Sequence, residues 1–188
     1  MTATPYRLGC VFLVACFVQV AVGADLDRAK LRKQLIFHEG RKTKVYNDSE
    51  GIPTIGVGFN LKRADAKKQI ENLTLDYKKV LAGDQALTDT QIDTLLDADI
   101  DTAISSSKSV FPKFTDLSDV RQRVLVDMMF NLGKSKFEVF KDMIAAVKAG
   151  KYNVAADEMK DSKWYKQVKD RGPRLETMMR TDTDPNKW

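Results

Sequence analysis

The chain has 188 residues, of which 43% are hydrophobic and 30% charged, and its formal net charge at pH 7 is +5. This size and composition predict a soluble globular core in a single domain, preceded by a processing segment. The excess of cations would favour an anionic surface, but the sequence lacks basic clusters interleaved with aromatic residues. Nucleic acid is therefore not an expected partner.

Residues 1–23 are predicted to be a secretory signal peptide, because residues 8–21 are almost wholly apolar and Ala21 and Gly23 suit cleavage after Gly23. The apolar run is short for a membrane span, and an uncleaved anchor is the weaker alternative. Both cysteines lie in this segment, so the mature domain, residues 24–188, would have no disulfide. We therefore expect a secreted, extracellular protein without a membrane anchor, with routing to a lysosome or phagosome as the alternative.

The first predicted helix of the mature chain ends at a carboxylate. Leu31 and Leu35 form an apolar stripe with Gln34 off it, Glu39 is the next i+4 step, and Gly40 follows as a stop signal. A carboxyl at that position would be partly desolvated, which favours its protonated form. The alternative is an ordinary exposed glutamate, but a negative charge near a helix C-terminus is unfavourable.

A β-hairpin is predicted next, over residues 43–59. Residues 44–46 would form the first strand, and residues 47–51 the turn, which carries a second carboxylate at Asp48. Residues 54–59 would form the second strand, which begins after Pro53. Strand alternation places one apolar face toward the core and leaves the other nearly bare, so that a bulky ligand could approach it. The core face would hold Ile55, Val57 and Phe59, and the bare face Thr54, Gly56 and Gly58.

The rest of the chain is predicted to be helical, with a polar tail that frays from residue 181 onward, Trp188 excepted. The first helix and the later ones give an α+β, mainly α fold with a small β-hairpin lobe, a long connecting helix and a larger helical lobe around a central helix. The cleft between the lobes is the natural ligand site. One helix is predicted to begin at residue 89 behind the Thr88–Gln91 capping box, with its end marked by the serines at 105–107 and by Pro112. The other predicted helices are 25–39, 64–81, 119–132 capped by Asp116 or Ser118, 137–149, 154–159, 164–168 and 174–179.

Several kinds of catalytic site are not expected. His38 is the single histidine and the mature chain has no cysteine, which argues against zinc sites, Ser-His-Asp triads and Cys-His proteases. The acidic positions Asp97, Asp99 and Asp101 resemble part of a calcium loop, but they fall in a helical pattern without the loop glycine and final glutamate. We expect no metal and no cofactor, which leaves carboxylate chemistry.

Five short motifs then appear in order, at residues 37–40, 45–51 with 54–58, 120–133, 162–165 and 170–174. Together they resemble the phage-type lysozymes, glycoside hydrolase family 24, and the steps from Glu39 to Asp48 and on to Thr54 match that family. A secretory signal before such a domain is similar to the phage-type lysozymes of some invertebrates. The resemblance implies a lysozyme-like two-lobed fold.

The resemblance also implies roles for individual residues. Glu39 would be the general acid that protonates the glycosidic oxygen, and Asp48 would support the water or the positive charge that develops on the sugar. Thr54 would help to hold that water, and Arg171 would orient Glu39. An inverting route needs the two carboxyls about 6.5–9.5 Å apart. The implied substrate contacts are Asn60, Phe130, Met143 and Glu158.

Three positions depart from the family pattern near the catalytic groups. Phe59 occupies the position of a histidine in the familiar phage enzyme, so the ion pair of that histidine is absent. His38 replaces an acidic residue beside the glutamate, and Pro53 stiffens the start of the returning strand. None of these changes removes a catalytic group, but each could move the pH optimum or the fit of the substrate.

The predicted function is that of an N-acetylmuramidase, which hydrolyses the β-1,4 bond between N-acetylmuramic acid and N-acetylglucosamine in bacterial peptidoglycan. We expect a monomer that acts with inversion, in antibacterial defence or in digestion of bacteria. The alternative is a catalytically silent recognition protein that binds peptidoglycan, and a third reading is a basic protein that disrupts membranes without catalysis. Glu39, Asp48 and Thr54 are all present, which favours the enzyme.

Overall fold

The computed structural model describes residues 25–188, so the predicted signal peptide lies outside the described residues. Within this part, no helix is both long enough and apolar enough to cross a membrane. The elements in chain order are α1 (Arg28–Glu39), β1 (Lys42–Asn47), β2 (Pro53–Gly56), β3 (Phe59–Asn60), α2 (Ala66–Asn72), α3 (Tyr77–Ala82), α4 (Asp89–Val110), η1 (Phe114–Asp116), α5 (Asp119–Leu132), α6 (Lys134–Phe137), α7 (Lys141–Lys148), α8 (Tyr152–Asp161), α9 (Lys163–Gln167) and α10 (Arg171–Thr181).

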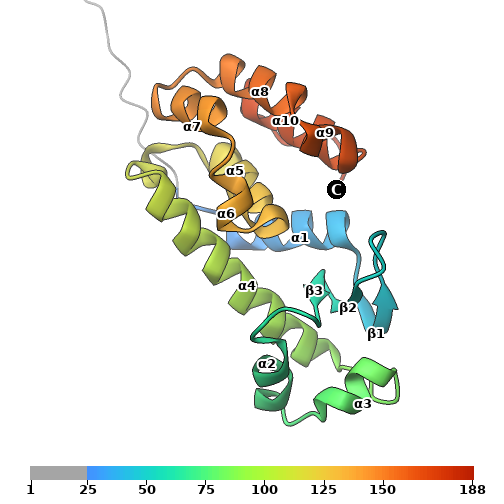
Figure 1. The fold of residues 1–188 in the computed structure, drawn as a ribbon. Helices are drawn as coiled ribbons and strands as arrows, with labels where there is room; N and C mark the ends of the chain where they lie inside the picture. Colours follow the sequence, from blue (N-terminus) through green and yellow to red (C-terminus); the bar gives the residue numbers. More distant parts are fainter. Residues whose placement is uncertain (1–24) are drawn as a thin grey trace, which may run out of the picture.

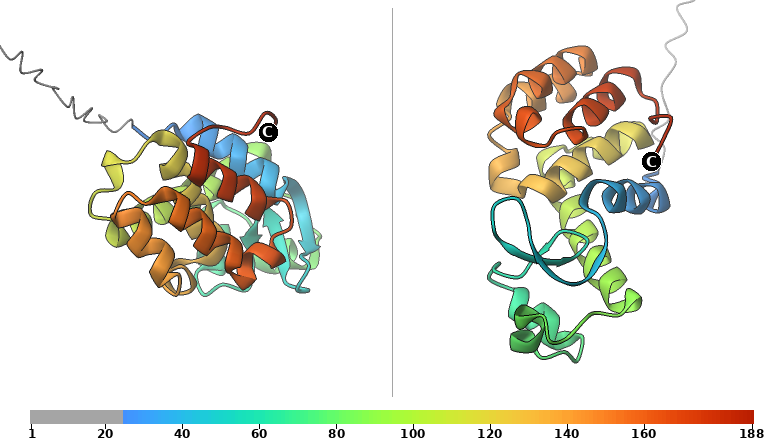
Figure 2. Two further views of the ribbon diagram at one scale, coloured as in Figure 1. Left: turned by 90° about the horizontal axis from the view of Figure 1, so that it is seen from above. Right: turned by 90° about the vertical axis from the view of Figure 1, so that its right-hand side faces the viewer.

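Helix α4 connects two parts of the molecule (Figure 1). The small sheet, α2 and α3 lie at its N-terminal end, and the remaining helices gather at its other end, with the C-terminal helices stacked outermost (Figure 2). Thr88 and Gln91 form the predicted capping box, and the helix buries Ile92, Leu96 and Ile100 as expected. The α+β, mainly α fold with two lobes is therefore confirmed.

The sheet has three antiparallel strands in the order β1-β2-β3, and this corrects the prediction of a single returning strand. Pro53 does begin β2, but the strand ends at Gly56, and a turn leads to the short β3. Gly56 and Gly58 have φ values of 65° and 70°, which β-strands do not adopt and which glycine tolerates best. Positive φ at both glycines therefore bends the chain where the alternating pattern predicted a straight strand.

The expected division of the returning segment into two faces is only half right. Ile55, Val57 and Phe59 are buried as predicted. The other face is not bare: a Cβ at Gly56 would meet the side chain of Ile92 at 3.5 Å, so that glycine packs on α4. Gly56 therefore allows the backbone of β2 to pack closely against Ile92 and does not mark a ligand surface.

Several predicted helices have different bounds in the structure, and the short helices predicted at 154–159 and 174–179 are the longer α8 and α10. The segment 64–81 is two helices, α2 and α3, because Thr74 takes a φ of 61° and Asp76 caps α3 through the amides of Lys78 and Lys79. Helix α4 continues past the serines, with Ser107 on its buried face, and ends at Val110, two residues before Pro112, which was the other predicted stop. The helix predicted at 137–149 is α7, which begins only at Lys141, and Phe137 is instead the last residue of the separate short helix α6.

Helix α5 is the central helix of the larger lobe, as predicted. Ser118 caps its first turn by accepting the amide hydrogen of Arg121, and Gly133 ends it with a φ of 72°. Its middle residues, from Gln122 to Met129, are all buried. Two of them, Arg123 and Asp127, are charged and fully buried, which an apolar pattern does not predict.

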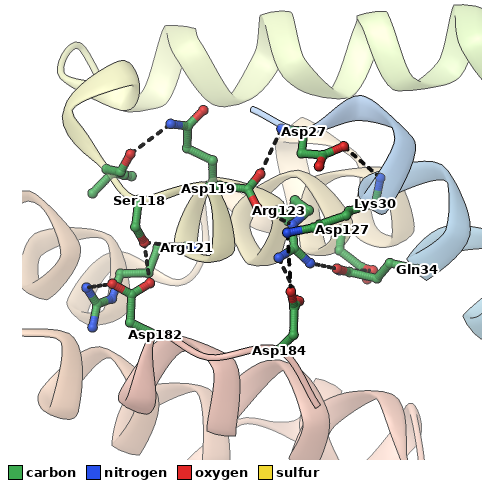
Figure 3. Close-up of polar contacts among 12 residues, drawn as sticks. Asp27, Lys30, Gln34, Ser118, Asp119, Arg121, Arg123, Asp127, Asp182 and Asp184 are labelled. Carbon is green, nitrogen blue, oxygen red and sulfur yellow. Dashed lines mark hydrogen bonds and ion pairs between the residues drawn. The ribbon is translucent and has the colours of Figure 1, made fainter. Parts of the chain in front are cut away.

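The C-terminal tail does not fray as predicted, because ion pairs hold it against α5 (Figure 3). Asp182 pairs with Arg121 at 3.0 Å, and Asp184 pairs with Arg123 at 2.6 Å. Trp188 then packs edge-on against the ring of His38, with 5.4 Å between the ring centroids. The tail is thus part of the helical lobe and covers the end of α1.

Candidate active site

Glu39 is the last residue of α1, and its side chain is 20% exposed. Leu31 and Leu35 bury the apolar face of the helix, which fixes the direction in which the next turn projects. Gln34, predicted to lie off this face, is buried too, because its amide binds other polar groups. Gly40 has a φ of 74° and donates its N–H to Ile36 at 2.9 Å, so the chain turns away directly after Glu39.

The carboxyl of Glu39 lies over the backbone of the turn between β2 and β3. A Cβ at Gly58 would come within 2.9 Å of Oε2 of Glu39. Real Cβ atoms do not approach so closely, so a side chain at this position would displace the carboxyl. Gly58 therefore serves the placement of Glu39 itself, a role that the alternating pattern did not indicate.

Arg171, the first residue of α10, lies against this carboxyl and is 7% exposed. Its Nη1 donates to Oε1 of Glu39 at 2.5 Å, and its Nε donates to Oδ1 of Asp127 at 2.7 Å. Burial alone would lower the pKa of Arg171, but the charges of Asp127 and Glu39 outweigh it and raise that pKa above its ordinary value. The guanidinium is therefore a permanent cation held between two carboxyl groups.

One row of side chains crosses the sheet next to this group. Thr54 of β2 is opposite Tyr46 of β1 and opposite Asn60 of β3. Directly opposed residues project from the same face of a sheet, so the register brings Asn60 beside Thr54 and Tyr46. Burial, and after it the charges of Glu39 and Asp48, raises the pKa of the Tyr46 phenol. Both carboxyl groups therefore act on one phenol, which remains a neutral hydrogen-bond donor.

Asp48 is held in the turn after β1 by its own neighbours. Its Oδ1 accepts the amide hydrogens of Glu50 and Ile52 at 2.8 and 2.9 Å. The hydroxyl of Thr54 donates to the carbonyl oxygen of Ile52 at 3.0 Å. Since that bond uses the hydroxyl proton of Thr54, the lone pairs of its oxygen are directed elsewhere and can accept a hydrogen from another molecule.

The remaining predicted substrate residues lie in the helical lobe. Phe130 is partly buried and stands three residues after Asp127 on α5. Met143 and Glu158 line a pocket of about 510 Å³ with Trp164. Met143 has 0% exposure and can only form its floor, whereas Glu158 is half-buried at its side. None of Glu39, Asp48 and Thr54 lines this pocket.

Two residues of the site were missed by the sequence analysis. Tyr46 belongs to the same motif as Asp48. Its position opposite Thr54 places it in the site, but that position depends on the strand register. Asp127 is an aspartate in the middle of a helix that is otherwise mostly apolar, which is the signal that could have found it. In residues 25–188, no group of three or more histidines, cysteines or acidic residues could hold a metal ion.

The chain matches the family model described as phage lysozyme over residues 37–181, which is more than half of its length. The chain belongs to the phage lysozyme family. It is therefore a glycoside hydrolase of the lysozyme type with peptidoglycan as its substrate class, as the resemblance implied.

Curated relatives of this phage lysozyme agree with that membership. "Probable T4-type lysozyme 1" of Dictyostelium discoideum is 25% identical over 163 residues, which cover 82% of this chain and 96% of that protein. "Endolysin" of Salmonella phage P22 is 32% identical over 135 residues, which cover 70% of this chain and 78% of that protein. "Pre-baseplate central spike protein Gp5" of Enterobacteria phage T4 is 30% identical over 164 residues, 84% of this chain but 28% of that larger protein.

Proposed function

We propose that this phage lysozyme is a secreted N-acetylmuramidase that cuts the β-1,4 bond between N-acetylmuramic acid and N-acetylglucosamine with inversion. The observation that carries the proposal is the placement of Glu39. Its carboxyl lies over Gly58 and binds Arg171. The charges of Glu39 and Asp48 both act on the phenol of Tyr46. Two carboxyl groups with different surroundings are what a glycosidase requires.

In the proposed reaction, Glu39 donates a proton to the glycosidic oxygen as the bond to the sugar breaks. Arg171 then binds the carboxylate that the transfer leaves behind, through the same Nη1 contact of 2.5 Å. Arg171 also keeps the side chain of Glu39 in one orientation, because its planar guanidinium is itself fixed by the bond from Nε to Asp127.

Asp48 and Thr54 would act on the opposite side of the sugar. An inverting enzyme places a water there, with the carboxyl groups about 6.5–9.5 Å apart to leave room for it. The free lone pairs of the Thr54 hydroxyl suit it to accept a hydrogen from that water. Asp48 would accept the proton of the water or stabilise the positive charge that develops on the sugar ring, with Asn60 next to Thr54 as a substrate contact.

Secretion, a monomeric state and a role in defence against bacteria or in their digestion complete the proposal. A catalytically silent protein that binds peptidoglycan is the second candidate. The enzyme is favoured because the contacts around Glu39 and Arg171 hold a carboxyl that a mere binding surface does not need.

The bond that is cut can be identified from the sugar at the new reducing end. Purified peptidoglycan is digested, the products are reduced with borohydride, and the reduced sugar is determined after acid hydrolysis. We expect reduced N-acetylmuramic acid, and reduced N-acetylglucosamine would assign the protein to a different cleavage. No new reducing ends, with the protein still sedimenting with peptidoglycan, would favour the silent binding protein.

A further inference from the structure

Behind the catalytic glutamate lies a carboxylate without any exposed surface. Asp127 is 0% exposed, and its Oδ1 accepts the Nε hydrogen of Arg171 at 2.7 Å. Its Oδ2 accepts from Nε2 of Gln34 at 2.7 Å and lies 2.9 Å from Nδ1 of His38. Nη2 of Arg171 also donates to the backbone oxygen of Asp127 at 3.3 Å. Asp127 therefore determines the position of the guanidinium from two sides.

A further group of polar contacts keeps this carboxylate in place (Figure 3). Arg123 donates to the amide oxygen of Gln34 at 2.9 Å, so the amide nitrogen of Gln34 faces Asp127. Arg123 is in turn bound by Asp184 of the C-terminal tail at 2.6 Å. On the other side, Trp188 covers the ring of His38, whose side chain is 2% exposed. Water is thereby excluded from the side of Asp127 that faces away from Glu39.

The charges of this cluster bear on the proton that Glu39 must carry. Glu39 has to take up a proton to act as a general acid, although a guanidinium lies 2.5 Å away and favours the ionised carboxylate. Burial alone would raise the pKa of Asp127, but the charge of Arg171 and the hydrogen bond from His38 lower it to about 2. Asp127 is thus ionised at any pH where the enzyme would work, and it offsets the charge of Arg171.

Other charged and titratable groups face the cluster from each neighbouring element. Tyr46 of β1 and Asp48 of the following turn lie on the sheet side of Glu39. Arg123 of α5, paired with Asp184, lies on the far side of Gln34. His38 of α1 contacts Asp127 directly. Among these, Asp127 alone shares the guanidinium of Arg171 with Glu39.

We propose that Asp127 is a positioning residue of this phage lysozyme, which holds Arg171 against Glu39 and offsets its charge so that Glu39 can carry the proton that the reaction needs. The inference rests on the proposed function, in which Glu39 is the general acid. It adds a residue that neither the family match nor the resemblance assigns. His38, which stands where the family has an acidic residue, supports Asp127 from the side opposite Arg171.

The test is the substitution Asp127→Asn, which keeps the shape of the side chain and removes its charge. Arg171 would then act on Glu39 alone and stabilise its ionised form. We expect the alkaline limb of the pH–activity profile to move down by about one pH unit and kcat to fall about 10-fold at neutral pH, with KM changed less than about 2-fold. A pH profile and kcat that match those of the unsubstituted enzyme would overturn the proposal.

Asp99→Asn is the matched control, because Asp99 also pairs with an arginine, Arg63, and is 16% exposed, but it lies on α4 and has no contact with Glu39. We expect its pH profile to match that of the unsubstituted enzyme. If Asp127→Asn fails to fold, the pH profile of His38→Leu tests the proposal instead. In that variant Asp127 loses a hydrogen-bond donor, so its charge acts more fully on Arg171. The alkaline limb of the profile should then move to higher pH. A limb that stays in place or moves down would contradict the proposal.

A readout without catalysis separates this inference from the proposed function. Carbon-13 NMR of the carboxyl groups follows the titration of Glu39 directly in the unsubstituted protein and in Asp127→Asn. We expect Glu39 to titrate at lower pH in the variant, and identical titrations would overturn the role of Asp127 even in an active enzyme. An inactive unsubstituted protein would instead contradict the proposed function. The role of Asp127 would then be tested by the NMR titration alone.

Discussion

Replacing Glu39 by glutamine is expected to reduce the cleavage of peptidoglycan by at least about 1,000-fold, because the amide cannot donate the proton that the leaving oxygen needs. Glutamine has nearly the same shape and still accepts a hydrogen bond from Arg171, so the fold should be preserved. The measurement is the rate at which new reducing ends appear from purified peptidoglycan. Sedimentation with the same material should show that binding persists.

Glu71→Gln is the matched control for this substitution. Glu71 is an exposed glutamate of α2 whose contact is an ion pair with Lys67 at 3.8 Å on the same helix. Its loss should leave the cleavage rate within about 2-fold, since exposed ion pairs contribute little. Full activity of Glu39→Gln would show that another group donates the proton and would contradict the assignment of the acid.

Replacing Arg171 by methionine is expected to have the largest effect on stability. The change leaves two carboxyl groups, those of Glu39 and Asp127, facing a space without a cation. Breaking a buried ion pair from one side costs about 3–5 kcal/mol of unfolding free energy. Urea unfolding at neutral pH measures this loss, and cleavage should fall as well because Glu39 is no longer held in one orientation.

The pH dependence of stability separates this explanation from a general packing defect. In the unsubstituted protein the pKa of Asp127 is lowered from 3.8 to about 2, so the stability that its charge contributes is present above the ordinary pKa and lost as the pH falls toward 2. In Arg171→Met the buried charge has lost its main partner, so acidification from pH 7 should recover part of the lost stability. A loss of stability that is the same at every pH would contradict this explanation.

Arg174→Met provides the control on the same helix. Arg174 lies over the exposed ring of Phe37, with 4.9 Å between its guanidinium carbon and the ring centroid, and bonds the backbone oxygen of Lys187 at 3.0 Å. These contacts are near the surface and should contribute about 1 kcal/mol or less.

The parts of the site that were predictable from the sequence are those determined by local rules. The end of α1 at Glu39 followed from an apolar stripe and a glycine stop, and both are observed. The turn that holds Asp48 followed from its composition, and the bonds from the amides of Glu50 and Ile52 explain why aspartate suits it. Local patterns of this kind extend over a few residues and can be recognised without knowledge of the fold.

The parts that were not predictable depend on contacts between distant segments. Gln34, Asp127 and Arg171 come from α1, α5 and α10, and nothing within each helix indicates that its polar side chain meets the others. The predicted role of Arg171 came from the resemblance and not from the pattern of its neighbours. The purpose of Gly58 was also hidden, because the atom that it accommodates belongs to Glu39 on another element.

The division of work between Glu39 and Asp48 is tested most directly by the configuration of the first product. Proton NMR of a short peptidoglycan oligosaccharide, recorded during the first minutes of digestion, distinguishes the two anomers before they interconvert. If water attacks from the side of Asp48 and Thr54 while Glu39 protonates the opposite side, the first signal belongs to the inverted α anomer. A first signal from the retained β anomer would contradict the account and make Asp48 a nucleophile.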